Sequence, residues 1–166
     1  MTETIYPVEL TAPDIEAYRT GNTGVEFVTT FDSGTAGPHV MINAVTHGNE
    51  ICGAIALDAL LKADARPVQG KLTLGFINHM AFQTFDPQAP DLSRFVDEDF
   101  NRVWVEERLD GVEDTVELRR ARELRPIFDS VDLLLDIHSM GTHSGALMIC
   151  NGLEKERTFS RLVNFP

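Results

Sequence analysis

The sequence contains few features that would place it outside ordinary globular proteins. Its two cysteines, Cys52 and Cys150, are too few for a disulfide framework and form no CxxC metal-binding pair. No apolar stretch reaches the roughly 20 residues that a membrane-spanning helix needs. The N-terminal residues lack a basic segment followed by an apolar run, so we expect no signal peptide and a cytoplasmic location.

Positive charge is also scarce. The 166 residues include 14 Lys and Arg against 26 Asp and Glu, for a formal net charge of −12. Such a surface repels phosphate backbones and anionic membranes, so we expect neither nucleic acid nor membrane as a partner. The hydrophobic content of 43% is that of a folded chain, and the length suits one domain. These features leave the oligomeric state open.

Strand-like and helix-like segments alternate along the chain. Runs rich in β-branched and aromatic residues predict strands at 25–31, 39–45, 71–78, 131–137 and 145–150. Apolar residues at helical spacing predict helices at 51–62, 115–128 and 154–163, with a short one near 14–19. Residues 79–114 form a long excursion of the kind that carries function. The alternation predicts an α/β fold with a mixed, largely parallel sheet.

The motif His47-Gly48-Asn49-Glu50 lies between a predicted strand and a predicted helix, where α/β sheets place their ligands. Its imidazole and carboxylate can turn toward one point, and both groups suit Zn²⁺. Alone the motif is weak, because short patterns also arise by chance. The alternative is a turn histidine and a glutamate at the positive end of a helix dipole. We expect Asn49 to be the N-cap of this helix.

A second histidine, His138, follows the apolar strand 131–137 in the same way. With His47 and Glu50 it completes a set of two histidines and one carboxylate. Such a set leaves a fourth coordination position open, as in catalytic zinc sites, and suits hydrolysis of amides or esters. Asp136, an acid among leucines, needs a partner. It either hydrogen-bonds a ligand histidine or ties down the end of the strand.

The excursion contains the run SRFVDEDFNRVW, with Arg94, Asn101 and Arg102. Guanidinium groups bind carboxylates through paired hydrogen bonds, so these residues are candidates for substrate binding. The alternative is that the arginines form surface ion pairs with the acids of the same run. His79 is a weaker candidate for lining a pocket, and His143, near His138, for supporting the metal ligands without binding the metal. For both, the alternative is a histidine with a structural role only.

Three motifs, HGNE, SRFVDEDFNR and LDIHS, occur in this order within the region from roughly Val40 to Ser139. Together they resemble the succinylglutamate desuccinylase/aspartoacylase family, which is related to the zinc carboxypeptidases. The resemblance implies a zinc-carboxypeptidase-like three-layer sandwich. It also implies one Zn²⁺ per chain, held by His47, Glu50 and His138.

The resemblance further implies how a substrate is bound. Asn101 and Arg102 match the pair that holds a substrate carboxylate. Arg94 matches the arginine that contacts the substrate carbonyl or carboxylate and stabilises the oxyanion. The implied reaction removes an acyl group from an N-acyl amino acid or a similar small amide that bears a carboxylate.

The family's general base is a glutamate in a segment well after the third zinc ligand. After His138 this chain offers only Glu154 and Glu156, so we expect the base to lie outside it. We therefore expect residues 1–166 to form an N-terminal zinc-binding catalytic domain that lacks the family's C-terminal segment. Two alternatives stay open: a metallocarboxypeptidase acting on peptides, and a metal-binding domain without catalytic activity.

Overall fold

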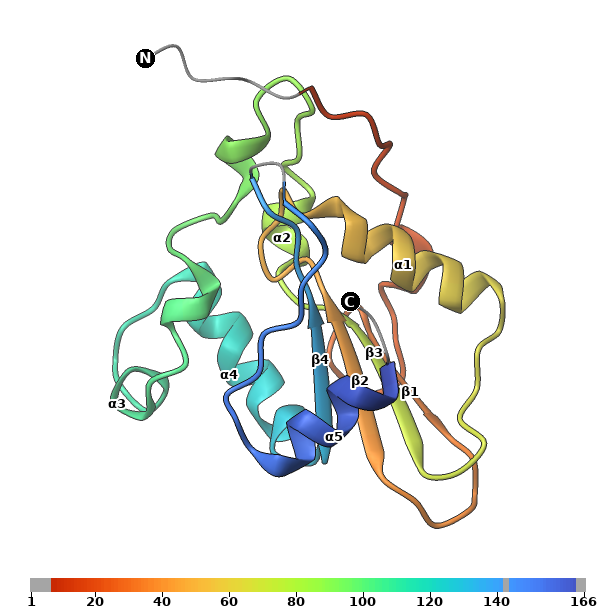
Figure 1. Cartoon of the computed structure of the whole chain (residues 1–166). Coiled ribbons are helices and arrows are strands. Elements are labelled where there is room, and N and C mark those ends of the chain that lie inside the picture. Colours follow the sequence, from red (N-terminus) through yellow and green to blue (C-terminus); the bar gives the residue numbers. More distant parts are fainter. Residues whose placement is uncertain (1–6, 142–143, 164–166) are drawn as a thin grey trace.

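The fold is built on a four-stranded sheet with strand order β1-β3-β2-β4 (Figure 1). The computed structural model describes residues 7–141 and 144–163. The strands are β1 (Val28–Asp32), β2 (His39–Ala44), β3 (Lys71–Phe76) and β4 (Leu133–Ile137). Strand β2 runs parallel to β3 and β4, whereas β1 is antiparallel to β3. The predicted α/β fold with a mixed, largely parallel sheet is confirmed.

Helices fill most of the connections between strands. The α-helices are α1 (Ile51–Lys62), α2 (His79–Phe82), α3 (Glu106–Leu109), α4 (Val116–Phe128) and α5 (Glu154–Val163), and the 3₁₀ helices are η1 (Glu16–Tyr18), η2 (Pro90–Ser93) and η3 (Phe100–Arg102). The excursion at 79–114 is therefore a chain of short helical turns. Within the described residues, no helix is long and apolar enough to cross a membrane.

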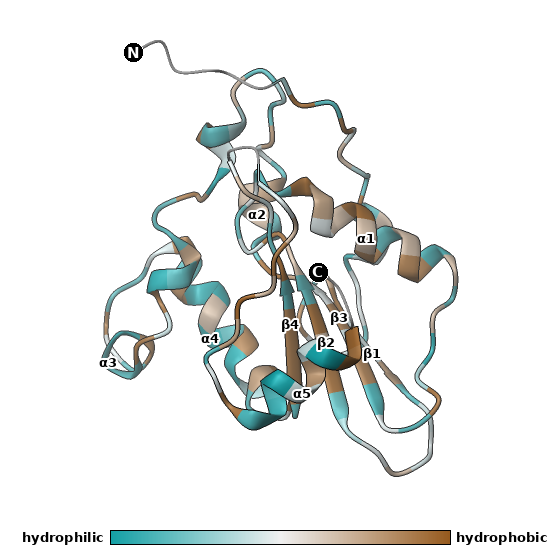
Figure 2. Ribbon diagram, in the orientation of Figure 1, coloured by the Kyte–Doolittle hydropathy of each residue, from teal (hydrophilic) through white to brown (hydrophobic). Residues whose placement is uncertain are grey.

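Two hydrophobic clusters lie on opposite faces of the sheet, because successive side chains of a strand point to opposite sides. Helix α1 packs on one face, where the buried residues include Ala44, Leu57, Leu74 and Phe76. Helix α4 packs on the other face, where they include Val28, Met41, Leu118 and Leu124. Figure 2 shows hydrophobic residues along the strands between these helices. The three layers of the expected sandwich are thus present.

The predicted strand at 145–150 is wrong. These residues have no regular secondary structure, and Ile149 is 85% exposed. A strand needs a hydrogen-bonding partner. Among the described residues, β4 pairs only with β2, and segment 145–150 joins no ladder. Its apolar pattern is typical of a strand, but none of the described strands lies beside it as a hydrogen-bonding partner.

Candidate metal centre

The three predicted metal ligands meet at one edge of the sheet. His47 and Glu50 lie in the turn between β2 and α1, and His138 follows β4 directly. Because β2 and β4 are parallel neighbours, their carboxyl ends reach the same edge. One ligand-type atom from each of the three residues lies within 4.8 Å of the others. Side chains separated by up to 91 positions are thus brought within reach of a single ion.

Glu50 stands between the two imidazoles. Its Oε1 is 2.8 Å from Nδ1 of His47, and its Oε2 is 2.8 Å from Nδ1 of His138. The backbone N–H of Ser139 also donates to Oε2, at 2.9 Å. The side chains of His47 and Glu50 are buried, whereas that of His138 is about one third exposed. The cluster is therefore open to the surface on the His138 side.

The charges of the cluster are strongly coupled. Burial opposes ionisation of Glu50, but hydrogen bonds from His138, His47 and the Ser139 amide outweigh it and lower the pKa of Glu50 to about 2. The hydrogen bonds of His138 to Asp136 and Glu50 raise its pKa to about 10, against the effect of burial. The carboxylates thus favour a positive charge at this position, which a divalent cation would also supply.

Each imidazole has a second carboxylate on its far side. His138 Nε2 lies 2.8 Å from Asp136 Oδ2, and the hydroxyl of Thr46 donates to the same carboxylate at 2.9 Å. His47 Nε2 lies 3.1 Å from Asp99 Oδ1. When Nε2–H donates to a carboxylate, the Nδ1 lone pair is left for a metal. Asp136 thus makes the hydrogen bond to a candidate ligand that its place among leucines suggested.

Arg94 reaches into the same cluster. Its guanidinium lies 3.3 Å from Glu50 Oε1, 3.0 Å from His47 Nε2 and 3.4 Å from Asp99 Oδ2. Its side chain is 38% exposed, so part of it faces solvent beside the candidate ligands. The sequence left open that Arg94 forms only surface ion pairs with neighbouring acids. Arg94 does pair with one of them, Asp99, but this ion pair lies beside the candidate ligands.

Asn101 and Arg102 are exposed residues of the 3₁₀ helix η3, next to Asp99. The N–H of Asn101 donates to Asp99 Oδ1 at 2.9 Å, and the Arg102 guanidinium donates to the Asn101 carbonyl at 3.2 Å. Neither side chain touches the three candidate ligands among the contacts of the described residues. Both residues are tied to the site through Asp99.

The turn that carries the motif is tightly packed. A Cβ atom on Gly48 would overlap the Ser93 carbonyl oxygen and the backbone of Ala81, so only glycine fits.

The predicted N-cap is wrong. Glu50, not Asn49, occupies that position, and no side chain caps the helix. The N–H of Glu50 instead bonds the carbonyl of His47 at 3.1 Å, which keeps both candidate ligands within one turn.

The remaining histidines lie elsewhere. His79 is buried against Phe27, with ring centroids 4.4 Å apart, and is not one of the clustered ligands. His39 begins β2, where Nδ1 contacts the Ser130 carbonyl and Nε2 contacts the Thr73 hydroxyl. His143 lies outside the described residues.

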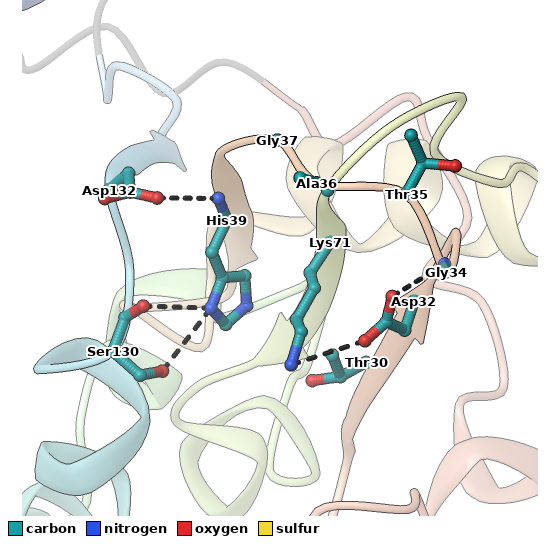
Figure 3. Close-up of a pocket in the computed structure, with 11 residues that line it drawn as sticks. Thr30, Asp32, Gly34, Thr35, Ala36, Gly37, His39, Lys71, Ser130 and Asp132 are labelled. Atoms are coloured by element: carbon teal, nitrogen blue, oxygen red, sulfur yellow. Dashed lines mark hydrogen bonds and ion pairs between the residues drawn. The ribbon is translucent and has the colours of Figure 1, made fainter.

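A cavity of about 530 Å³ lies at the opposite edge of the sheet (Figure 3). It is lined by polar groups that include His39, Asp132, Lys71 and Asp32. These groups bond one another: Asp132 accepts the His39 N–H, and Lys71 pairs with Asp32. The cavity therefore lies away from the candidate ligands and does not enter the site.

The donor atoms fit a zinc ion. Two imidazole nitrogens and one carboxylate oxygen form the set found in catalytic zinc sites, and all three lie within reach of one ion. The motifs predicted these three residues, whereas Asp99 was expected only as an ion-pair partner of an arginine. The signal available for Asp99 was its position beside Asn101 and Arg102 in the run SRFVDEDFNR.

Comparison with known proteins agrees with this geometry. Residues 36–165 match the sequence profile described as "Succinylglutamate desuccinylase/Aspartoacylase catalytic domain". The chain is 32% identical to an aspartoacylase of Xenopus tropicalis over 122 residues, which is 66% of this chain and 36% of that protein.

Solved structures show the same likeness. A succinylglutamate desuccinylase/aspartoacylase from Rhodobacter sphaeroides is 25% identical, with a TM-score of 0.56 over 82% of this chain and 42% of that one. The ectoine utilization protein of Ruegeria pomeroyi is 27% identical, with a TM-score of 0.53 over 69% and 34%. The chain thus spans between a third and a little over two fifths of the length of these relatives. With its fold, its clustered residues and a profile match over most of its length, the chain belongs to the succinylglutamate desuccinylase/aspartoacylase family.

Proposed function

We propose that this chain is the zinc-binding part of a hydrolase that removes an acyl group from an N-acyl amino acid or a similar small amide. The observation that carries the proposal is the convergence of His47, Glu50 and His138 at the carboxyl edge of the sheet, in a chain of a deacylase family. Bound there, Zn²⁺ would act as a Lewis acid toward the amide carbonyl. One ion per chain is expected.

The residues around the ion have separate roles in this proposal. Arg94 lies against both His47 and Glu50 with part of its guanidinium exposed, so it can contact a substrate carbonyl and stabilise the charge that develops on its oxygen. Asn101 and Arg102 are exposed nearby and supply donors for a substrate carboxylate. The selectivity would then favour small amides that carry a carboxylate.

The proposed activity concerns the complete catalytic unit. The chain spans only a part of its relatives' length, and the residue that accepts the proton of the attacking water is expected outside it. An inactive metal-binding domain is therefore the second candidate. It is favoured by the absence, among the described residues, of a further glutamate next to the three candidate ligands.

The test is hydrolysis by the untagged complete catalytic unit, which includes the part expected to supply the general base, loaded with Zn²⁺ or treated with chelator. Substrates are N-acetyl-aspartate, N-succinyl-glutamate and a short peptide, and release of free amine is measured. We expect zinc-dependent release from the N-acyl amino acids, and its loss in Arg94→Leu. Arg161→Leu is the matched control, because Arg161 lies on the exposed face of α5 with its side chain 73% exposed.

The outcomes separate the candidates. Release from the peptide alone would identify a carboxypeptidase. Zinc binding without hydrolysis of any substrate would overturn the hydrolase and leave the metal-binding domain.

A further inference from the structure

A fully buried carboxylate holds the segment that leads into the candidate site. Glu117, in the first turn of α4, is 0% exposed. Its Oε1 accepts the N–H of Val96 at 2.7 Å and the side-chain amide of Asn78 at 3.2 Å. Its Oε2 accepts the N–H groups of Asp97 at 3.0 Å and Glu98 at 3.3 Å. Three successive backbone amides thus converge on one side chain.

Two further hydrogen bonds join segment 96–98 to the start of α4. Together with the bonds to Glu117 they form what we call the clamp. The carboxylate of Asp97 accepts the N–H of Val116 at 2.7 Å, and the hydroxyl of Thr115 donates to Glu98 at 2.6 Å. Among the described residues, no lysine or arginine pairs with Glu117, so N–H donors alone satisfy it. A buried carboxylate is unfavourable unless donors surround it, which makes this arrangement specific to one position of segment 96–98.

The clamped segment ends directly before Asp99. Asp99 Oδ1 lies 3.1 Å from His47 Nε2, and its Oδ2 lies 3.4 Å from an Arg94 nitrogen. Because residue 98 is bonded to Glu117 and residue 99 to His47, a shift of the clamped amides moves the Asp99 carboxylate away from the imidazole. A hydrogen bond of this kind holds a ligand histidine in one tautomer and orientation.

We propose that Glu117 is a positioning residue for the metal centre. It fixes segment 96–98 so that Asp99 holds His47 with Nδ1 turned toward Glu50 and the ion. The inference rests on the proposed function in one respect: His47 must bind the metal. The packing of α4 has its own basis in Leu118, Ala121 and Leu124, which are buried on the sheet-facing side of the helix.

The test measures Co²⁺ affinity, with the visible absorption of bound Co²⁺ as the signal, in the wild type and in Glu117→Gln. Glutamine keeps the shape of the side chain but places an amide donor against the N–H groups. We expect Glu117→Gln to weaken Co²⁺ binding about fivefold to tenfold. Asp99→Asn, which alters the direct hydrogen-bond partner of His47, should weaken it more, by about 10- to 100-fold. Glu107→Gln, an exposed position on α3, is the matched control and should bind as the wild type does.

Coupling separates positioning from a general loss of stability. In the Asp99→Asn background, Glu117→Gln should have little further effect, because the residue through which it acts is already altered. The inference would be overturned if the loss of Co²⁺ affinity in the double variant equalled the product of the two single losses. Wild-type Co²⁺ affinity in Glu117→Gln would overturn it as well. If Glu117→Gln does not fold, Asp97→Ala removes the exposed half of the same clamp, and the same coupling to Asp99 is required of it. A wild-type protein that binds no Co²⁺ would instead overturn the proposed function, and this inference with it.

Discussion

The two candidate histidines are each held by one carboxylate that is not itself a candidate ligand. Asp136 bonds His138, and Asp99 bonds His47. Replacing Asp136 by alanine should weaken Zn²⁺ binding about 10- to 100-fold, because the imidazole loses its fixed orientation and tautomer. Competition with a chromophoric chelator measures the affinity. Asp132→Ala, just before the other end of β4, is the control, and equal affinities in the two variants would contradict the assigned role.

His79 gives the fold a sensitivity to acid. Burial, reinforced by the nearby charges of Arg120 and Arg19, lowers its pKa from 6.5 to about 4. Its Nδ1 is buried without a hydrogen-bond partner among the described residues. Between these two pH values the unfolded chain binds a proton that the folded chain does not, so stability falls as the pH falls from 6.5 to 4. Above pH 6.5 the residue has no such effect.

The size of this effect follows from the shift. His79→Gln should remove up to about 3 kcal/mol of the acid-dependent loss of unfolding free energy between pH 6.5 and 4. Urea unfolding of metal-free wild type and variant across this range measures the difference. Parallel curves of unfolding free energy against pH would show that His79 titrates normally in the folded protein.

Among the elements, the turn between β2 and α1 tolerates the least change. Gly48→Ala places a methyl group against the Ser93 and Ala81 backbones, so the turn must move. We expect a loss of about 1–3 kcal/mol of stability, as for overpacking, together with weaker metal binding. Gly145→Ala is the control, since an added Cβ there meets nothing within 4 Å and should change stability by less than about 0.5 kcal/mol. Similar behaviour of both variants in thermal unfolding and metal titration would refute this.

Local patterns predicted the four strands of the sheet and the longer helices α1, α4 and α5. The predicted helix 51–62 has the bounds of α1, and the predicted strands at 39–45 and 71–78 extend one or two residues beyond β2 and β3. In each case apolar spacing and packing agree. The segment 145–150 has the same apolar character, but strand formation depends on a neighbouring ladder, which the sequence of the segment does not contain.

The residues of the candidate site were likewise predictable only in part. His47 and Glu50 share one turn, and His138 ends a strand next to it, so motif spacing and sheet topology sufficed to group them. From the sequence, Glu117 is only one acid near the start of the predicted helix 115–128. Its role depends on backbone amides about 20 positions earlier in the chain, and N–H groups are present in almost every residue. Such contacts have no residue-type signal, so they become visible only in the structure.

At the scale of the whole molecule, the site exists only when β2 and β4 are paired. The candidate ligands lie on segments far apart in the chain, so Zn²⁺ should bind the folded state in preference to the unfolded one. Zinc at about 100 times its dissociation constant should then raise the unfolding free energy by about 2.7 kcal/mol. Thermal unfolding with and without zinc measures this effect. The increase should disappear in His138→Ala, and an equal increase in that variant would assign the effect to zinc bound elsewhere.

Zinc binding by the three candidate ligands is tested by the zinc stoichiometry of the untagged protein, measured by calorimetric titration and elemental analysis after removal of excess metal. We expect one zinc ion per chain, lost in His47→Ala and in His138→Ala and retained in His39→Ala. Less than about half an equivalent in the wild type, or undiminished zinc in both ligand variants, would contradict this expectation.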